Sequence, residues 1–230
     1  MKVWIFVEGE SDRIALNTLW ANWRESLGRR GWGIHVIPLE NKSHFFKKIG
    51  HRAAEKLTNN EDDLVVGLPD LYPNHEYMNS QYKHAHIGEL KTVQAKLVEK
   101  ALTDVFGLSQ TKSEVALVRF HPTAFKHDME MLLLAARDEL RTVLRTPDAL
   151  DSWQHPVEDQ NQIKPPKHVV EDLFQAKKGK RYRDTVDAKA VLEKVADIRM
   201  ILYHNENQLQ CPLFKELMDW IGARTGIPAY

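Results

Sequence analysis

The chain has 230 residues, of which 43% are apolar, and its 32 basic side chains balance its 32 acidic ones. This balance excludes a nucleic-acid binder that coats itself in positive charge, but a local basic patch beside a metal is compatible with it. Cys211 is the single cysteine, which excludes an internal disulfide. No apolar run reaches the roughly 18 residues that a membrane helix needs. We therefore expect a cytoplasmic protein with no membrane partner.

Strands and helices are predicted to alternate through the first half of the chain. Apolar, β-branched runs predict strands at 3–7, 34–39, 63–68 and 114–120. Apolar residues at helical spacing predict helices at 11–27, 44–57 and 88–106. Parallel neighbours require a crossover connection, which this alternation provides. The pattern therefore predicts an α/β fold, with a Rossmann-like and mainly parallel sheet of about four strands flanked by helices.

The second half of the chain is predicted to be mainly helical. A helix is expected at 127–144, and further helices at 169–177, 188–202 and 212–221. Between them, residues 146–166 are rich in proline, acids and amides, which predicts an exposed excursion. We expect a single domain, in which residues 1–146 form the α/β core. Residues 147–230 would supply the excursion and C-terminal helices that pack on this core.

Acidic residues follow two of the predicted strands. Glu8 comes directly after the first strand and Asp70 after the third. Ligands of parallel α/β sheets lie beyond the carboxyl ends of the strands, so both acids should reach one edge. Asp12, one helical turn after Glu8, could reach the same ion. Oxygen ligands alone suit Mg²⁺ or Mn²⁺. Alternatively, Asp12 only complements a helix dipole and Asp70 only shapes a turn.

A third polar group is predicted at the start of the helix that follows the fourth strand. His127 and Glu130 are three residues apart, so they would share one helix face. That face could present a metal ligand and a proton-transfer group to the sheet edge, with Asp128 between them. The alternative is that Asp128 and Glu130 only complement the dipole of the helix.

These motifs resemble a known family in their order along the chain. Val7-Glu8-Gly9-Glu10-Ser11-Asp12, followed by a strand that ends in Asp70, resembles the Toprim (topoisomerase–primase) fold. The pattern is nearest to small Toprim-like proteins of unknown function from bacterial defence and mobile-element operons. In those proteins a Glu-Gly-x-x-Glu/Asp motif comes first, a strand end that contains Asp comes second, and a helix start with the pattern His-acid-x-Glu comes third. This chain matches the three motifs in that order, through residues 8–12, Asp70 and residues 127–130. The segment 211–217 also resembles their Cys-Pro-x-Phe ending.

The resemblance implies a Toprim core and Mg²⁺- or Mn²⁺-assisted cleavage of phosphodiester bonds in DNA or RNA, tRNA included. The implied metal ligands are Glu8, Asp12, Asp70 and Asp128. Glu130 or Glu8 would be the base, and His127 would orient the water or protonate the leaving oxygen. Toprim proteins often have Asp-x-Asp at the third strand, whereas Tyr72 stands at the second acidic position here, which puts a second metal in doubt. The resemblance also implies an anti-phage defence effector that works with a separate ATPase.

Basic residues supply the expected contacts to nucleic acid. Lys178, Lys180, Arg181 and Arg183 surround Tyr182, and this run could neutralise a phosphate backbone and offer one stacking surface. Lys42 follows the second strand and leads into a helix N-terminus, which suits an anion. The alternative for the run is a solvated loop between helices.

Two other functions stay open at this point. The chain could be a non-catalytic Toprim-like module that binds a partner protein or nucleic acid, which the missing second acid favours. It could also be a phosphohydrolase or nucleotidyl transferase that acts on a small phosphate ester. The sequence leaves the oligomeric state open, a homo-oligomer included.

Overall fold

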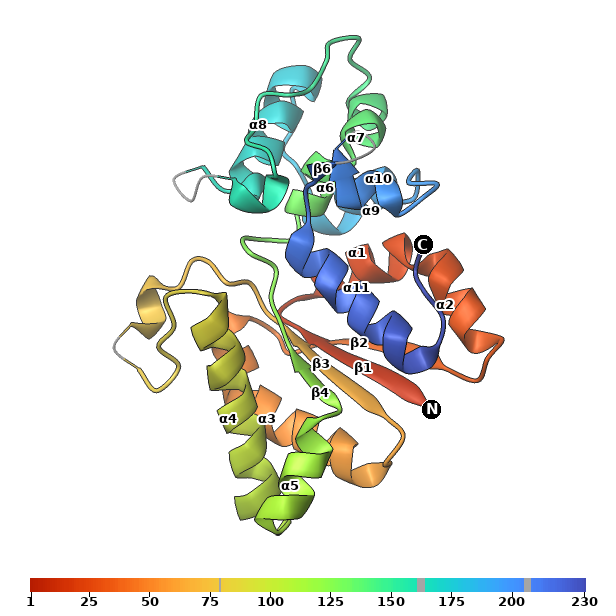
Figure 1. Ribbon diagram of the computed structural model, residues 1–230. Helices are drawn as coiled ribbons and strands as arrows, with labels where there is room; N and C mark the ends of the chain where they lie inside the picture. The colour runs from red at the N-terminus through yellow and green to blue at the C-terminus, as the bar shows by residue number, and fades with distance from the viewer. Residues whose placement is uncertain (79, 161–163, 205–207) are drawn as a thin grey trace.

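A computed structural model describes residues 1–78, 80–160, 164–204 and 208–230, apart from the side chain of Glu76. Its centre is a four-stranded parallel sheet with the strand order β2-β1-β3-β4 (Figure 1). The strands are β1 (Lys2–Val7), β2 (Gly33–Pro38), β3 (Leu64–Leu68) and β4 (Phe120–Pro122). The predicted α/β class and the parallel four-stranded sheet are confirmed.

The fourth strand lies later in the chain than the sequence predicts. Residues 110–117, which include most of the predicted strand at 114–120, form helix α5 (Gln110–Leu117). The hydroxyl of Ser109 accepts the N–H of Lys112 and caps this helix. Val115 and Val118 are exposed, so the valines that suggested a buried strand lie on a solvent-facing surface. The short strand β4 follows this helix.

Helices cover both faces of the sheet (Figure 1). One face packs against α3 (Lys42–Asn59), α4 (Ile87–Asp104) and α5. The other face packs against α1 (Glu10–Leu19), α2 (Ala21–Gly28) and α11 (Pro212–Thr225). Alternate residues of β1 point to the two layers, since Val3 and Ile5 belong to one core and Phe6 to the other. The continuous apolar runs of the strands reflect this double burial.

The single helix predicted at 11–27 is two helices that meet at Trp20. Trp20 has a backbone conformation outside the helical region, with φ −95° and ψ 14°. Its side chain is fully buried and stacks on Phe214 of α11, with ring centroids 5.8 Å apart. The break therefore lets one aromatic residue join the first helical layer to the last helix of the chain.

The C-terminal part is helical, as expected, but two of its predicted helices are divided. The helix predicted at 127–144 is divided into α6 (Met131–Ala135) and α7 (Arg137–Leu144) by the non-helical residue Ala136. The helix predicted at 188–202 is likewise two helices. The elements that follow α7 are the 3₁₀ turn η2 (Val157–Asp159), α8 (Pro166–Lys178), α9 (Asp184–Leu192), α10 (Arg199–Leu202) and the strands β5 (Tyr203–His204) and β6 (Gln208–Leu209). Helix α9 packs directly on α1, so this part shares a core with the sheet layer.

The segment between α7 and α8 is not the exposed excursion that its composition predicts. Leu150, Trp153 and Val157 are buried in the same core as the sheet face. The buried carboxylate of Glu158 accepts the backbone N–H groups of Leu213 and Phe214, at 2.9 and 3.1 Å. These are donors at the start of α11, so the segment caps the last helix. Residues 161–163 of the predicted excursion lie outside the described residues.

Within the part of the chain that the structure describes, no helix combines the length and apolar character that a membrane span requires.

Candidate metal centre

The ends of β1 and β3 form the switch point of the sheet. Val7 of β1 lies opposite Pro38 of β2 on one side and Leu68 of β3 on the other, so the three strands end at one level. The chain turns to opposite sides of β1 at this point, and parallel α/β sheets bind ligands in the crevice of such a switch point. A carboxylate oxygen of Glu8 accepts the backbone N–H of Asp70 at 3.0 Å, so the two acids meet as the sequence predicts.

A cleft of about 850 Å³ opens above this switch point. Seven of the residues predicted for the site line it, and they come from four separate segments of the chain. They are Glu8, Asp12, Lys42, Asp70, His127, Asp128 and Glu130. The fold therefore gathers every predicted catalytic and metal-binding residue at one cleft.

Asp12 serves the helix N-terminus and the cleft together. Its Oδ2 accepts the backbone N–H of Gly9 at 2.9 Å, so it helps to cap helix α1. The side chain is only 7% exposed. Burial raises the pKa of Asp12 to about 6, although the N–H of Gly9 and the charge of Lys167 act in the opposite direction.

Asp70 has a carboxylate oxygen with no partner. The residue is half-buried, and its Oδ1 is enclosed and makes no hydrogen bond within the described part of the chain. Burial raises the pKa of Asp70 well above its usual value, and the charges of Glu8, Asp12 and Asp128 raise it further. A buried, unpartnered carboxylate oxygen among other acids is unfavourable unless a cation is close to it.

Asp128 and Glu130 stand in a turn before α6, and not inside a helix as predicted. Oδ2 of Asp128 accepts the backbone N–H of Lys167 at 3.2 Å, whereas its Oδ1 is buried without a partner in the part of the chain that the structure describes. Burial raises the pKa of Asp128 to about 8, and the charge of Glu130 adds to this effect. Glu130 is 3% exposed, and burial raises its pKa as well. A nearby cation would therefore stabilise the ionised form of both acids.

His127 is buried in the wall of the cleft. Its ring lies beside that of Tyr72, with centroids 5.6 Å apart, and its Nδ1 is buried with no hydrogen-bond partner among the described residues. Burial lowers the pKa of His127, and the charge of Lys126 lowers it further. The ring is therefore neutral near pH 7, a state in which it accepts a proton more readily than it donates one.

Lys167 is a member of the site that the sequence reading missed. It stands in the first turn of α8, lines the cleft and pairs with Asp184 at 3.8 Å. Burial alone would lower the pKa of its ammonium group, but the charges of Glu130, Asp184 and Asp128 raise it. No motif in the sequence around Lys167 indicates this role. Only the packing of α8 over the switch point brings its ammonium group to the acids.

The predicted basic run lies beside the cleft and not in it. Lys180 and Arg183 pair with the buried Asp187, at 2.7 and 3.5 Å. Arg181 and Arg183 line a neighbouring cavity of about 390 Å³, which shares Lys167 with the cleft. Lys178 lines neither of these two cavities and is half-buried.

The positions of Tyr182 and Lys42 bear on the nucleic-acid contacts that the sequence predicts. Tyr182 is 5% exposed and lies against Glu130, so its ring does not offer the stacking surface that the sequence predicts. Nζ of Lys42 donates to the carbonyl oxygen of Pro73 at 2.6 Å, at the rim of the cleft. Lys42 is therefore the one predicted nucleic-acid contact that lines the cleft itself.

Comparison with known proteins identifies the family. Residues 7–222 match the family described as "Domain of unknown function (DUF4276)". The chain belongs to the DUF4276 family. No curated protein matches it.

Two solved structures of the C-terminal region of the Xanthomonas campestris pv. campestris OLD protein are similar to this DUF4276 chain. The structure phased with mercury is 13% identical, with a TM-score of 0.42. The structure phased with iodine is 16% identical, with a TM-score of 0.39. Each similarity covers 84% of this chain and 85% of the other.

The cleft of the DUF4276 chain fits a cation that keeps most of its water. Among the described residues, no three ligand atoms of the cleft acids lie within 4.8 Å of one another. Mg²⁺ usually binds through one or two carboxylates, and waters or phosphates complete its octahedron. The unpartnered oxygens of Asp70 and Asp128 are suited to such a site. The donor set therefore fits Mg²⁺ or Mn²⁺ better than an ion that requires four protein ligands.

Proposed function

We propose that this chain is a metal-dependent nuclease of Toprim type that cleaves phosphodiester bonds in DNA or RNA. The observation that carries the proposal is the junction of Glu8 and Asp70 at the switch point of the sheet, where Oδ1 of Asp70 is buried without a partner. Acids gathered at this position favour a bound cation. The resemblance of Val7–Asp12 to the Toprim motif supports the same reading.

The acids of the cleft and His127 each have a role in this proposal. Asp70 and Asp128 would hold Mg²⁺ or Mn²⁺, with Glu8 and Asp12 beside them. When bound, the ion stabilises charge on the scissile phosphate and acidifies a water molecule. Glu130 has a raised pKa and would take the proton from the attacking water. The neutral ring of His127 would orient that water.

The cations around the acids favour a polyanionic substrate. Lys42 and Lys167 line the cleft, and Lys167 also lines the neighbouring cavity with Arg181 and Arg183. A chain of phosphates could follow this path, because each cation along it can neutralise one phosphate charge. A small phosphate ester would need only the cleft, so the extended basic path favours a polymer.

A second candidate is a non-catalytic module that binds nucleic acid or a partner protein. It is favoured by Tyr72, which stands where a second acid is expected, and by the separation of the cleft acids. Such a module would still bind a polyanion through Lys42 and Lys167 without cleaving it.

The cellular role that we propose rests on the Toprim resemblance. In this role the chain is the effector of a bacterial anti-phage system, acts in the cytoplasm and works with a separate ATPase. These 230 residues contain no phosphate-binding loop of the P-loop type, so the proposal assigns no nucleotide-driven step to them.

The test is cleavage of end-labelled DNA and tRNA in Mg²⁺ and in Mn²⁺. We expect wild-type protein to cut one of the two polymers, and EDTA, Glu8→Gln or Asp70→Asn to reduce the rate at least about 100-fold. Glu25→Gln changes an exposed acid of α2 and is the matched control. Cleavage that persists in Asp70→Asn would contradict the proposed site. Polymer binding without any cleavage would select the second candidate.

A further inference from the structure

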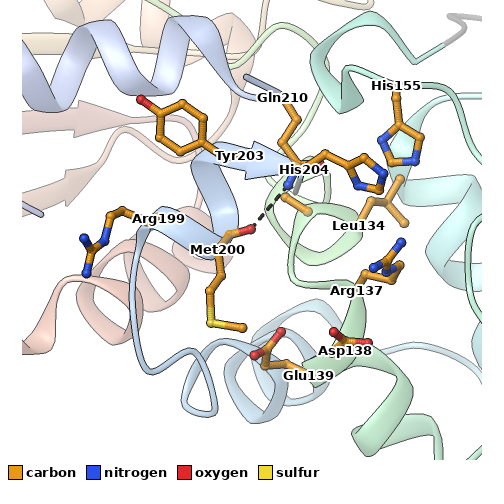
Figure 2. A pocket seen from close by; sticks show the side chains of 11 residues that line it. Leu134, Arg137, Asp138, Glu139, His155, Arg199, Met200, Tyr203, His204 and Gln210 are labelled. Carbon is orange, nitrogen blue, oxygen red and sulfur yellow. Dashed lines mark hydrogen bonds between the residues drawn. The ribbon is translucent and has the colours of Figure 1, made fainter. Parts of the chain in front are cut away.

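A second cavity lies away from the switch point, between α6, α7, α10 and the β5–β6 hairpin (Figure 2). Its volume is about 520 Å³, and it shares no lining residue with the cleft. Figure 2 shows the imidazole rings of His155 and His204 side by side in its wall. These histidines come from segments about fifty residues apart, so the tertiary fold creates their proximity.

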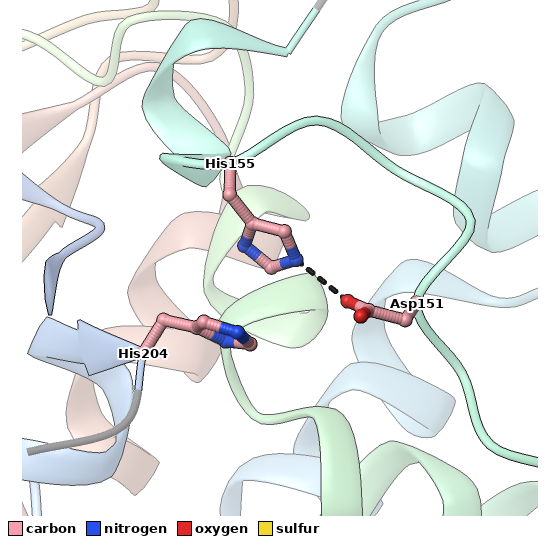
Figure 3. A group of neighbouring side chains, drawn as sticks. All are labelled: Asp151, His155 and His204. Atoms are coloured by element: carbon pink, nitrogen blue, oxygen red, sulfur yellow. Dashed lines mark hydrogen bonds and ion pairs between the residues drawn. The ribbon is translucent and has the colours of Figure 1, made fainter.

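A carboxylate completes this pair of histidines. Oδ1 of Asp151 lies 2.7 Å from Nε2 of His155, and the ring centroids of His155 and His204 are 4.1 Å apart (Figure 3). Each of the three side chains offers a ligand atom within 4.8 Å of the other two. Among the described residues, this is the group of histidines and acids that satisfies that distance.

The chemistry of these donors points to a transition metal. Two imidazole nitrogens and one carboxylate oxygen suit Zn²⁺ and its neighbours, whereas Mg²⁺ prefers oxygen ligands alone. Imidazole nitrogens in the neutral form carry the lone pair that binds such an ion. Nδ1 of His155 is also buried without a hydrogen-bond partner in the described part of the chain, so an ion could use either ring nitrogen.

We propose that Asp151, His155 and His204 bind one divalent transition-metal ion of the Zn²⁺ class, with the remaining coordination position open to the cavity. Three protein ligands and an open position are the arrangement of zinc ions that bind a water or a small ligand. The ion would join the segment before η2 to strand β5. These regions already touch, because the rings of His155 and His204 lie with their centroids 4.1 Å apart.

The positive charge of Arg137 should weaken metal binding, which gives a further test of the proposed site. Its guanidinium lies 3.9 Å from Oδ1 of Asp151, so it competes with a metal for that carboxylate. Removing this charge in Arg137→Gln should therefore tighten metal binding several-fold, because like charges repel at this distance.

The experiment is a calorimetric titration of untagged, EDTA-treated full chain with Zn²⁺, paired with the absorption spectrum of the Co²⁺ form. We expect one tight site and the intense visible bands of four-coordinate Co²⁺. Asp151→Asn, His155→Ala and His204→Ala should each weaken binding by more than about 100-fold, since loss of an outer partner alone costs 10–100-fold. His51→Ala, which changes an exposed histidine of α3, should bind as wild type does.

Two further variants separate this site from the cleft and from a folding defect. Asp70→Asn should retain the Zn²⁺ site, and Asp151→Asn should retain any nucleic-acid cleavage. Asp151 is exposed, so its variant should stay folded, and circular dichroism before titration confirms that. Wild-type protein that binds no Zn²⁺ would overturn the proposal. So would a site that survives both histidine substitutions or that is lost in Asp70→Asn.

Discussion

The carboxylate of Glu8 accepts the backbone N–H of Asp70 across the switch point of the sheet, at 3.0 Å. This bond fixes the acid that follows β1 against the acid that follows β3. It leaves the side chain of Asp70 directed into a cluster of acids, where Oδ1 has no partner in the described structure. The cleft is therefore organised around negative charge that the protein alone only partly compensates.

The contribution of the cleft acids Asp12 and Asp128 to stability without metal should become less favourable as the pH rises from about 4 to about 8. Burial raises the pKa of Asp12 to about 6 and that of Asp128 to about 8, whereas unfolded aspartates ionise near 4. The folded state therefore binds more protons in this range, and each proton lost on raising the pH destabilises it. Urea unfolding at stepwise pH values in EDTA measures the slope. Saturating Mn²⁺ should reduce it.

Asp128→Asn should make the metal-free protein more stable at pH 8, by on the order of 1–2 kcal/mol after allowance for its partial exposure. The amide cannot ionise, so it removes a charge that burial and Glu130 disfavour. The same variant should weaken Mn²⁺ binding. Equal stability of the variant and wild type at pH 8 would show that the ionised carboxylate of Asp128 does not destabilise the folded protein.

Lys167→Gln should weaken binding to nucleic acid about 10-fold at low salt and reduce the salt dependence by about one released ion. Lys167 lines both the cleft and the neighbouring basic cavity, so a polyanion would contact it in either. Fluorescence anisotropy with labelled DNA and RNA at several salt concentrations measures both effects. Lys100→Gln, an exposed change on α4, is the control. If the two variants bind equally, phosphate does not pass Lys167.

Gly50→Ala should destabilise the protein by about 1–3 kcal/mol, because it overpacks the contact between α3 and α4. A Cβ at Gly50 would lie 2.5 Å from the carbonyl oxygen of Leu97, and backbone atoms of a packed helix cannot move aside easily. Gly28→Ala in α2 meets nothing within 4 Å and should be neutral or stabilising by up to about 1 kcal/mol. Thermal unfolding of the pair checks the contrast.

Glu158→Ala should cost about 2–3 kcal/mol, because it leaves two buried N–H donors at the start of α11 without an acceptor. Glu25→Ala removes an exposed ion pair with Arg29 and should cost less than about 1 kcal/mol. Urea unfolding compares the two. Similar losses in both would show that Glu158 does not cap α11.

The sheet and its acids were predictable because their signals are local. Each of the first three strands is a short apolar run, and parallel strands bring Glu8 and Asp70 to one edge whatever the details of packing. The run at 114–120 failed as a prediction, because a few apolar residues fit a strand or a helix equally well. The cap at Ser109 and the exposure of Val115 decide it in favour of a helix.

The features that the sequence hid depend on contacts between distant segments. Lys167 reaches the acids only because α8 packs over the switch point. Asp151 and His204 meet only because the segment before η2 lies against the β5–β6 hairpin. Neither arrangement has a periodicity or a spacing that one stretch of sequence could reveal. The proline-rich composition of 146–166 likewise concealed the buried side chains of Leu150 and Trp153.

The most direct test of the central claim is a calorimetric titration of the full chain with Mn²⁺ at pH 8, beside Asp70→Asn and Asp151→Asn. If the acids at the ends of β1 and β3 hold the cation, wild type and Asp151→Asn will share an Mn²⁺ site that Asp70→Asn lacks. Equal binding of Mn²⁺ by wild type and Asp70→Asn would contradict the assignment of the cleft as a metal centre.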